Sequence, residues 1–227
     1  MVFKNRADAG RRLVPGLLWY KRQNPLVLAL PRGGVPVAYE VATALDAPLD
    51  IVVVRKLGAP GRPELGIGAV VDGDQAQSVL NDDMVRLLEV SEEYLAAEVA
   101  RQLQEIRRRQ QLYRGGHPPE AVRGRTVIIV DDGIATGGSM RAALRAIRRG
   151  GADKLVVAVP VAPPETIAWL RQEADDVVCL SIPVRFQAVG QFYQDFRQTT
   201  DEEVMRLLDA SRQRRSTLSG LSALGEP

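Results

Sequence analysis

The amino-acid sequence predicts an α/β fold built on a parallel sheet. Its apolar segments are short, continuous and rich in β-branched residues, as expected of strands that are buried on both faces. Segments with the apolar spacing of helices alternate with these strands along the chain. The 227 residues are enough for one such domain with small additions.

The expected elements follow one another with few interruptions. In order they are a helix at 5–22, a strand at 26–30, a helix at 35–45, strands at 51–54, 67–71 and 78–80, a helix at 82–113, a strand at 126–130, a helix at 137–149, a strand at 155–159, a helix at 164–172 and a strand at 177–180. Pro15 and Gly16 predict a kink or a break in the first helix. Residues 55–66 are expected to form a loop, because glycines and prolines interrupt any period there.

The composition disfavours several classes of protein. The formal net charge is only +2, which does not indicate a nucleic-acid binder. The single cysteine, Cys179, rules out an internal disulfide, and its apolar neighbours predict a buried position on a strand. The single histidine, His117, has no second His or Cys near it in the sequence, which disfavours a transition-metal site.

Neither a signal peptide nor a membrane span is expected. Residues 1–12 are charged, and no apolar run approaches the ~20 residues that cross a bilayer. A cytoplasmic location is therefore expected. Several arginines gather between Arg101 and Arg114. A solvated helix face is favoured over a nucleic-acid arm there, because Glu98 and Glu105 offset the charge and no aromatic residues are interleaved for base stacking.

Residues 127–139 carry the strongest functional signal. An apolar strand ends in Asp131 and Asp132, and a loop of small residues then leads into a helix. Ligands of open α/β sheets bind beyond the carboxyl ends of the strands. The loop offers unhindered backbone N–H groups, hydroxyls and a helix N-terminus, which together suit a phosphate. Its members are Ala135, Thr136, Gly137, Gly138 and Ser139.

The two carboxylates favour a different part of a ligand from the loop. Asp131 and Asp132 would repel a phosphate, but carboxylates can accept hydrogen bonds from the vicinal hydroxyls of a ribose. A phosphate at the loop and a diol at the carboxylates together describe a ribose 5-phosphate. A Walker-type NTPase is disfavoured, because no Gly-Lys-Ser or Gly-Lys-Thr follows a glycine-rich loop.

This segment resembles the binding motif for 5-phosphoribosyl-1-pyrophosphate (PRPP) of the type I phosphoribosyltransferases. That motif consists of an apolar strand, two acids, a small-residue loop and then Thr-Gly-Gly-Ser or Thr-Gly-Gly-Thr. Within the superfamily, the chain looks most similar to a group of predicted bacterial phosphoribosyltransferases, over about residues 1–209. The other segments that carry this similarity are 5–10, 30–38, 55–60, 64–69 and 188–196.

The resemblance implies the type I phosphoribosyltransferase fold, a Rossmann-like parallel sheet with a small hood. Here we expect an inserted helical segment as well, in a single domain over 1–209. The hood would come from 182–209 and the N-terminal helix, and 210–227 would form a flexible C-terminal tail. Residues 182–208 are expected to be irregular, and the Ser, Arg and Gly from 211 onward predict a frayed terminus.

The aromatic residues of the expected hood have two interpretations. They could stack on the flat ring of an acceptor, or they could pack the tail onto the domain as core residues. They are Phe186, Phe192, Tyr193 and Phe196.

A pyrophosphate site is also implied by the resemblance. In the family, the loop after the first core strand holds pyrophosphate, and Arg32, Gly33 and Gly34 occupy that place; a plain strand–helix turn would look the same. Lys56 matches a basic residue that contacts pyrophosphate or phosphate, although a solvated strand end is the alternative. Residues 57–66 resemble the flexible loop that closes over the site and excludes water.

The implied reaction transfers the 5-phosphoribosyl group from PRPP to a nucleobase or another nitrogenous acceptor, with release of pyrophosphate. Asp131, Asp132, Lys56 and Arg32 are the candidate catalytic residues. Mg²⁺ is the implied cofactor, and the two aspartates would reach it mostly through ribose hydroxyls and water.

Other activities remain open at this point. The main alternative is a regulator that binds PRPP or a nucleotide without turnover, since some members of the superfamily regulate transcription. A PRPP synthetase is disfavoured, because the chain is too short for the two tandem domains of those enzymes. The resemblance allows a homodimer, and no nucleic acid or membrane partner is expected.

Overall fold

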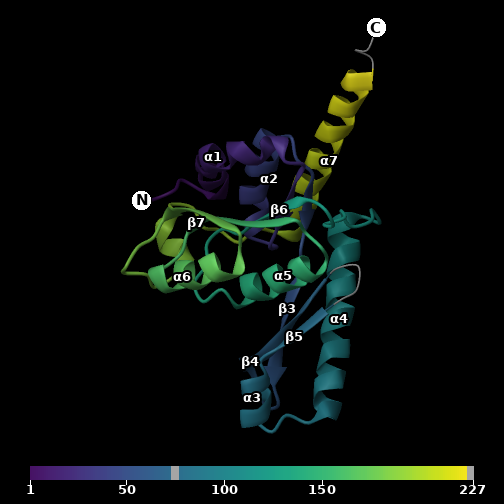
Figure 1. Cartoon of the computed structure of the whole chain (residues 1–227), viewed down its shortest axis with the longest axis vertical. Helices are drawn as coiled ribbons and strands as arrows, with labels where there is room; N and C mark the ends of the chain where they lie inside the picture. Colours follow the sequence, from purple (N-terminus) through teal and green to yellow (C-terminus); the bar gives the residue numbers. More distant parts are fainter. Residues whose placement is uncertain (73–76, 224–227) are drawn as a thin grey trace.

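A five-stranded parallel sheet with the strand order β2-β1-β6-β7-β8 lies at the centre of the protein (Figure 1). The computed structural model describes residues 1–72 and 77–223, apart from the side chains of 77 and 218–223. The strands of the central sheet are β1 (Pro25–Ala29), β2 (Leu49–Ile51), β6 (Thr126–Val130), β7 (Lys154–Val161) and β8 (Asp176–Ser181). The predicted α/β class is confirmed.

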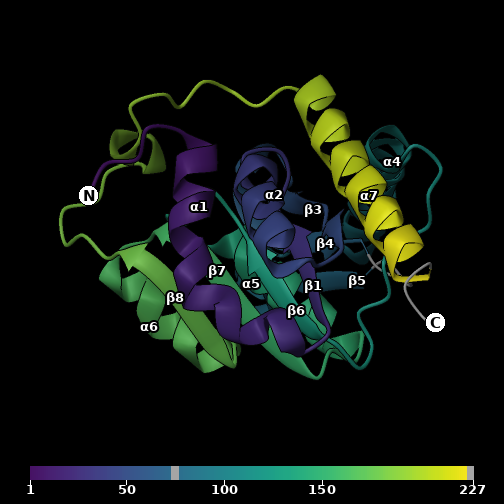
Figure 2. The same cartoon turned by 90° about the horizontal axis from the view of Figure 1, so that it is seen from above.

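Helices cover both faces of this sheet (Figure 2). On one face lie α1 (Arg6–Leu17), α2 (Gly34–Leu45) and the beginning of α7 (Asp201–Ala223); on the other lie α5 (Gly138–Arg149) and α6 (Pro164–Glu173). Successive residues of a strand point to opposite faces. Ile128 and Val130 of β6 therefore join the first core, and Val127 and Ile129 join the second. This two-sided burial explains the continuous apolar runs in the sequence.

The N-terminal helix extends through Pro15. It begins after Asn5, whose side chain accepts a hydrogen bond from the backbone N–H of Asp8. The α-helix gives way to a 3₁₀ helix, η1 (Leu18–Arg22). The predicted irregularity is thus a change of helix type after Leu17, two residues beyond the proline.

A second sheet replaces the loop predicted at 55–66. Strands β3 (Val54–Ala59), β4 (Arg62–Val71) and β5 (Gln77–Leu80) form an antiparallel sheet, below the central sheet in Figure 1. The loop prediction was wrong, because the first two strands form a hairpin with its turn at Pro60-Gly61. The predicted strand at 51–54 is divided between the two sheets, since β2 ends at Ile51.

Two helices complete this inserted part of the chain. They are α3 (Asp82–Leu87) and the long α4 (Glu92–Arg114), which confirm the inserted helical segment. Ser91 caps α4 by accepting a hydrogen bond from the N–H of Tyr94, and Gly115 ends it in the left-handed conformation. The sequence also predicts a turn at Asp72-Gly73, between β4 and β5, and Gly73 lies outside the described residues.

A buried ionic cluster joins the inserted part to the central sheet. Nε of Arg114 donates to Oδ1 of Asp50 at 3.0 Å, and Nη2 lies 3.2 Å from Oδ2 of Asp72. Asp72 also accepts a hydrogen bond from the backbone N–H of Val53 at 2.7 Å. Burial raises the pKa of Asp72 to about 6, against the opposing effect of Arg114.

The C-terminal part is helical where an irregular, frayed chain was expected. Helix α7 begins at Asp201 and continues to Ala223, so most of the predicted tail 210–227 is helical. Val204 and Leu208 are fully buried against the core. Arg214 donates to the backbone carbonyl of Ala42 and to Asp46. Residues 224–227 lie outside the described residues. Among the described helices, none is long and apolar enough to cross a membrane.

Candidate functional site

The central feature of the site is the turn from β6 into α5. Strand β6 is fully buried, and Asp131 and Asp132 follow at its carboxyl end. Gly137 then adopts a left-handed conformation (φ +76°) and precedes the first residue of α5. The backbone N–H groups of the first turn of α5 have no partner within the helix, so they are available to an anion.

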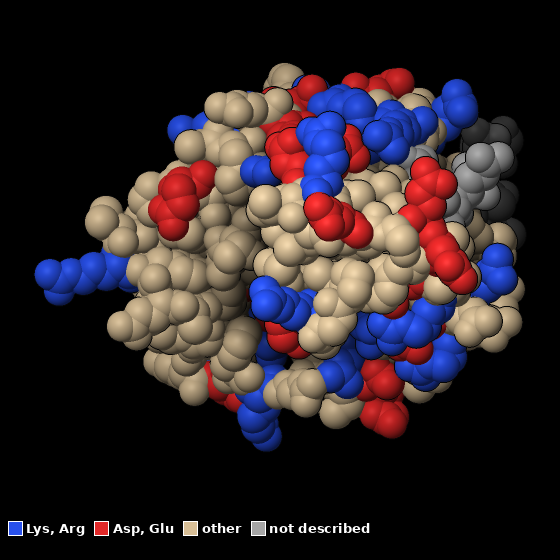
Figure 3. Space-filling view, turned by 90° about the horizontal axis from the view of Figure 1, so that it is seen from below, with Lys and Arg blue, Asp and Glu red and all other residues tan. Residues whose placement is uncertain are grey.

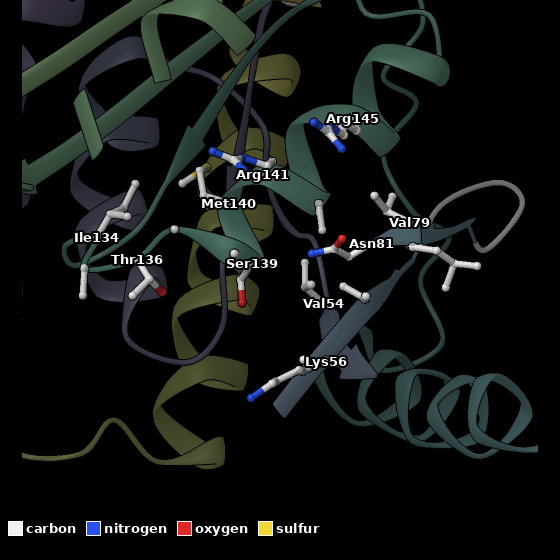
Figure 4. Close-up of a pocket in the computed structure, with 18 of the residues that line it drawn as sticks. Val54, Lys56, Val79, Asn81, Ile134, Thr136, Ser139, Met140, Arg141 and Arg145 are labelled. Carbon is white, nitrogen blue, oxygen red and sulfur yellow. The ribbon is translucent and has the colours of Figure 1, made fainter. Parts of the chain in front are cut away.

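A pocket of about 760 Å³ lies in front of this turn. It extends from the start of α5 to the antiparallel sheet, and Figure 4 shows Thr136, Ser139 and Lys56 around the same space. Its lining includes Asp131, the five loop residues Ala135, Thr136, Gly137, Gly138 and Ser139, and Lys56. The remaining walls come from β4, β5, the start of α3, and α5 as far as Arg145.

The two aspartates have different surroundings. Asp131 lines the pocket, and its Oδ1 accepts a hydrogen bond from the backbone N–H of Asp132 at 2.8 Å. Asp132 is outside the pocket lining and pairs with Arg6 of α1, whose Nε lies 2.8 Å from its Oδ2. Of the two aspartates, Asp131 is therefore the one that lines the pocket.

Burial raises the pKa of both carboxyl groups. The pKa of Asp131 is well above its usual value, because the group is desolvated and next to the charge of Asp132. Burial also raises the pKa of Asp132, but the guanidinium of Arg6 opposes this change. A hydroxyl donor or a cation beside Asp131 would stabilise its charged form.

The loop after β1 contacts both aspartates from the side of α2. A Cβ atom at Gly33 would lie 2.1 Å from Oδ2 of Asp132, and one at Gly34 would lie 2.7 Å from the carbonyl of Val130. Only glycine permits this close approach. The peptide bond between Pro31 and Arg32 is cis. The structure thus brings this loop and the acid pair together at the end of β6.

The two predicted cations of the site point in different directions. Lys56 lines the pocket, and its ammonium group donates to the backbone carbonyl of Glu64 across the hairpin. Arg32 is not among the residues that line the pocket. Its Nη1 lies 3.5 Å from Oδ1 of Asp201, the first residue of α7.

The N-terminal segment and the chain before α7 pack together beside Asp132. The backbone of Phe3 exchanges hydrogen bonds with the backbone of Phe192 and Gln194. Tyr193 donates its hydroxyl hydrogen to the carbonyl of Asp132 at 2.6 Å. These contacts place the predicted hood segments at the edge of the site.

The aromatic residues of this hood divide between the two interpretations. Phe192 and Tyr193 are buried together with Phe3, so they are core residues. Phe196 is 36% exposed, and the guanidinium of Arg6 lies 4.1 Å from its ring centroid. Phe186 is only partly buried. Among these four aromatic residues, Phe196 is thus the most exposed.

Sequence reasoning missed Arg6 as part of the site, and it named Tyr193 only as a candidate hood aromatic, without connecting it to Asp132. Both contact Asp132, from positions far away along the chain. The only signal was that each lies in a segment that carries the family resemblance, at 5–10 and 188–196.

The arginines of α4 are largely paired with acids of the same helix. Arg101 forms two hydrogen bonds with Glu98, and both Arg108 and Arg109 pair with Glu105. The face seen in Figure 3 shows basic and acidic side chains interspersed. Arg101 and Arg108 are exposed, as a solvated helix face requires, whereas their partner Glu98 is buried and Glu105 is partly buried.

No cluster of three or more potential metal-ligating side chains occurs in the part of the chain that the structure describes. Asp131 offers carboxylate oxygens, the kind of ligand that Mg²⁺ prefers. The site therefore fits an ion whose remaining ligands come from a bound substrate and water.

The chain is thus an α/β protein in which a small-residue loop, a helix N-terminus and an acid pair meet at the carboxyl end of one strand, where ligands of open α/β sheets bind. The family model of the phosphoribosyl transferase domain matches residues 4–196, so the chain belongs to the phosphoribosyltransferase family.

Two known proteins are similar to the chain over most or all of its length. The chain is 45% identical, over 226 residues, to the putative phosphoribosyl transferase Rv0571c of Mycobacterium tuberculosis; the match covers 100% of this chain and 51% of that protein. The crystal structure of TT1426 from Thermus thermophilus superimposes with a TM-score of 0.80 at 47% identity, covering 92% of this chain and 98% of that one. The chain thus spans about half the length of the mycobacterial relative.

Proposed function

We propose that the protein transfers the 5-phosphoribosyl group of PRPP to a nitrogenous acceptor and releases pyrophosphate. The observation that carries the proposal is the pocket that joins Asp131 to the N-terminal loop of α5. In this proposal, the carboxylate accepts hydrogen bonds from ribose hydroxyls and the loop binds the phosphate, which are the two requirements of a ribose 5-phosphate.

Each group of residues has a role in this proposal. The loop residues Ala135, Thr136, Gly137, Gly138 and Ser139 bind the 5-phosphate through N–H groups and hydroxyls. Asp131 accepts hydrogen bonds from the ribose diol, and Asp132 supports it while Arg6 neutralises part of the paired charge. Arg32, Gly33, Gly34 and Lys56 bind the pyrophosphate group.

The chemistry is a displacement at C1 of the ribose. The C1–O bond breaks, pyrophosphate leaves with the electron pair, and a nitrogen of the acceptor forms the new bond and loses a proton. The developing positive charge on the sugar resembles that in glycoside transfer. Mg²⁺, when bound, would neutralise the leaving pyrophosphate. The protein contributes mainly position and electrostatic stabilisation.

Water must be kept away from the activated C1 atom. The hairpin of β3 and β4 forms one wall of the pocket and occupies the chain positions where a closing loop was expected. We propose that this hairpin shields bound PRPP, that Phe196 and Arg6 border the acceptor, and that the hood comprises 182–209 with the N-terminal helix. We further propose a cytoplasmic reaction and a homodimer.

The first experiment measures PRPP binding. Isothermal calorimetry with Mg²⁺ and PRPP should detect binding to the wild type and none to the double variant Asp131→Asn/Asp132→Asn. Asp153→Asn is the matched control. Asp153 is an exposed acid just before β7, at the amino-terminal ends of the parallel strands, whereas the site lies at their carboxyl ends. Equal affinity of the double variant and the wild type would refute the site assignment.

The second experiment identifies the acceptor. Purified protein is incubated with PRPP, Mg²⁺ and each of a panel of nucleobases and amines, and pyrophosphate release is followed. Release that depends on one acceptor supports the transferase and names its substrate. PRPP binding without release for any acceptor would favour the regulator instead. The paired arginines of α4 give no specific support to that alternative.

A further inference from the structure

The contact between Arg32 and Asp201 links the proposed pyrophosphate loop to α7. Nη1 of Arg32 lies 3.5 Å from Oδ1 of Asp201, and both side chains are about one-third exposed (32% and 38%). The same carboxylate oxygen accepts a hydrogen bond from the hydroxyl of Tyr113 at 2.6 Å. Asp201 thus connects the loop after β1, the end of α4 and the start of α7.

The two bonds of this carboxylate differ in strength. The bond from Tyr113 is short, and burial together with this bond raises the pKa of Tyr113 to about 12, so the phenol remains a donor at neutral pH. The contact with Arg32 is longer than the 2.7–2.9 Å typical of a charged hydrogen bond. Ion pairs with this degree of exposure are weak. Asp201 is therefore fixed by Tyr113 and holds Arg32 only loosely.

The start of α7 is strongly acidic. Asp201, Glu202 and Glu203 occupy its first turn, and the hydroxyl of Thr200 accepts a hydrogen bond from the N–H of Glu203. Acids in this position stabilise the helix, but they also repel a polyanion. This turn lies beyond the residues that match the family model, which ends at 196.

A carboxylate and a pyrophosphate oxygen are the same kind of acceptor for a guanidinium group. We propose that Asp201 competes with pyrophosphate for Arg32, so that it weakens pyrophosphate binding and favours release of that product. This inference rests on the proposed function, because it requires Arg32 to bind pyrophosphate. Asp201 acts through Arg32 and is a positioning residue.

The test compares three variants at the start of α7. Asp201→Asn removes the competing charge, Asp201→Glu retains it, and Glu203→Gln removes a charge from the same turn, where no ion pair with Arg32 is present. Calorimetry with magnesium pyrophosphate should give a Kd about 5-fold lower for Asp201→Asn, the upper range for an exposed ion pair. The Glu203→Gln and Asp201→Glu proteins should remain close to the wild type.

Steady-state kinetics provide a second readout. In Asp201→Asn, the KM for PRPP and the inhibition constant of pyrophosphate should both fall, and kcat should fall with them if product release limits turnover. A protein with only a structural defect would not bind its product more tightly. Thermal melting checks the fold, and Asp201→Ser replaces the asparagine variant if that protein does not fold.

The outcomes separate this inference from the proposed function. If the wild type binds pyrophosphate and Asp201→Asn binds it equally or more weakly, Asp201 does not compete and the inference is wrong. An equal gain in affinity for Glu203→Gln also overturns it, because the effect would then be general repulsion. If the wild type binds neither PRPP nor pyrophosphate, both proposals fail.

Discussion

Arg6 holds Asp132 across 126 positions of the chain. Its Nε donates to Oδ2 of Asp132 at 2.8 Å, and its Nη1 donates to the backbone carbonyl of Arg197 at 2.6 Å. Both side chains of the pair are largely buried, with exposed fractions of 11% and 14%. One guanidinium thus ties the acid pair to the N-terminal helix and to the segment before α7. Arg6 is the charged partner of the Asp132 carboxylate.

We expect Arg6→Met to leave a desolvated, unpaired carboxylate at position 132. The free energy of unfolding should fall by about 1–3 kcal/mol, the usual cost of an unpaired buried group. PRPP affinity should also fall about 10-fold, as expected when a supporting partner no longer orients a ligand group. Urea titration and calorimetry measure the two effects.

The double variant Arg6→Met/Asp132→Asn provides the control. Removing the charge from Asp132 should recover part of the stability that Arg6→Met loses, because the buried residue is then neutral. Strictly additive losses in the double-mutant cycle would show that the ion pair is not energetically coupled.

The sequence was informative where a local pattern reports burial. Strand β6 has the predicted bounds, Thr126–Val130, because both of its faces are buried and every residue is apolar or β-branched. It was misleading at Gly58, which suggested a loop. In the structure Gly58 lies within β3, where a Cβ atom would be 2.7 Å from the Cα of Pro63 on the paired strand. This glycine permits a close, irregular strand pairing.

Long-range contacts explain most of what could not be predicted. The Ser- and Arg-rich sequence after 210 has little helical signal of its own, yet α7 is anchored by Val204, Leu208 and Arg214 on α2. Similarly, the motif at Asp131 and Asp132 predicted an acid pair with equivalent members. Their different surroundings arise from Arg6, which no local pattern connects to them.

Lys56 should be needed for PRPP binding. It is a cation in the lining of the pocket, and hydrogen bonds to charged groups contribute more than neutral ones. We expect Lys56→Met to weaken PRPP binding about 10-fold, with little change in the melting temperature. Arg62→Met is the matched control, since Arg62 is an exposed cation on the same hairpin outside the pocket lining. A similar loss in both variants would indicate only a general effect of charge.

A side chain at position 137 should destabilise the protein through both backbone strain and overpacking. Its φ of +76° disfavours other residues, and a Cβ atom would lie 2.2 Å from Cζ2 of Trp169. Gly116 has a similar φ of +87° but no atom within 4 Å of the Cβ position. Gly116→Ala should therefore cost about 1 kcal/mol of backbone strain, and Gly137→Ala about 1–3 kcal/mol more from overpacking. Urea unfolding measures both; equal losses would mean that Trp169 moves aside freely.

Asp72 should make stability depend on pH in an unusual direction. Its folded pKa, about 6, is above the ordinary 3.8, so the native state binds this proton more tightly than the unfolded state. Its contribution to stability is therefore greatest at low pH and falls as pH rises from about 4 through 6. The Asp72→Asn variant has no titratable carboxyl group at this position. Relative to this variant, the wild type should lose about 2 kcal/mol of unfolding free energy between about pH 4.5 and 7.

The measurement is urea unfolding of both proteins across this pH range. The comparison must be a difference, because carboxylates with lowered pKa values, such as Glu105, change stability in the opposite direction. The control variant Asp153→Asn, which removes an exposed acid, should show the same pH dependence of unfolding free energy as the wild type. A constant difference between wild type and Asp72→Asn would show that Asp72 stays ionised throughout. In that case the bond from Arg114 outweighs the cost of burial, and the cluster would act as a fixed ion pair between the two sheets.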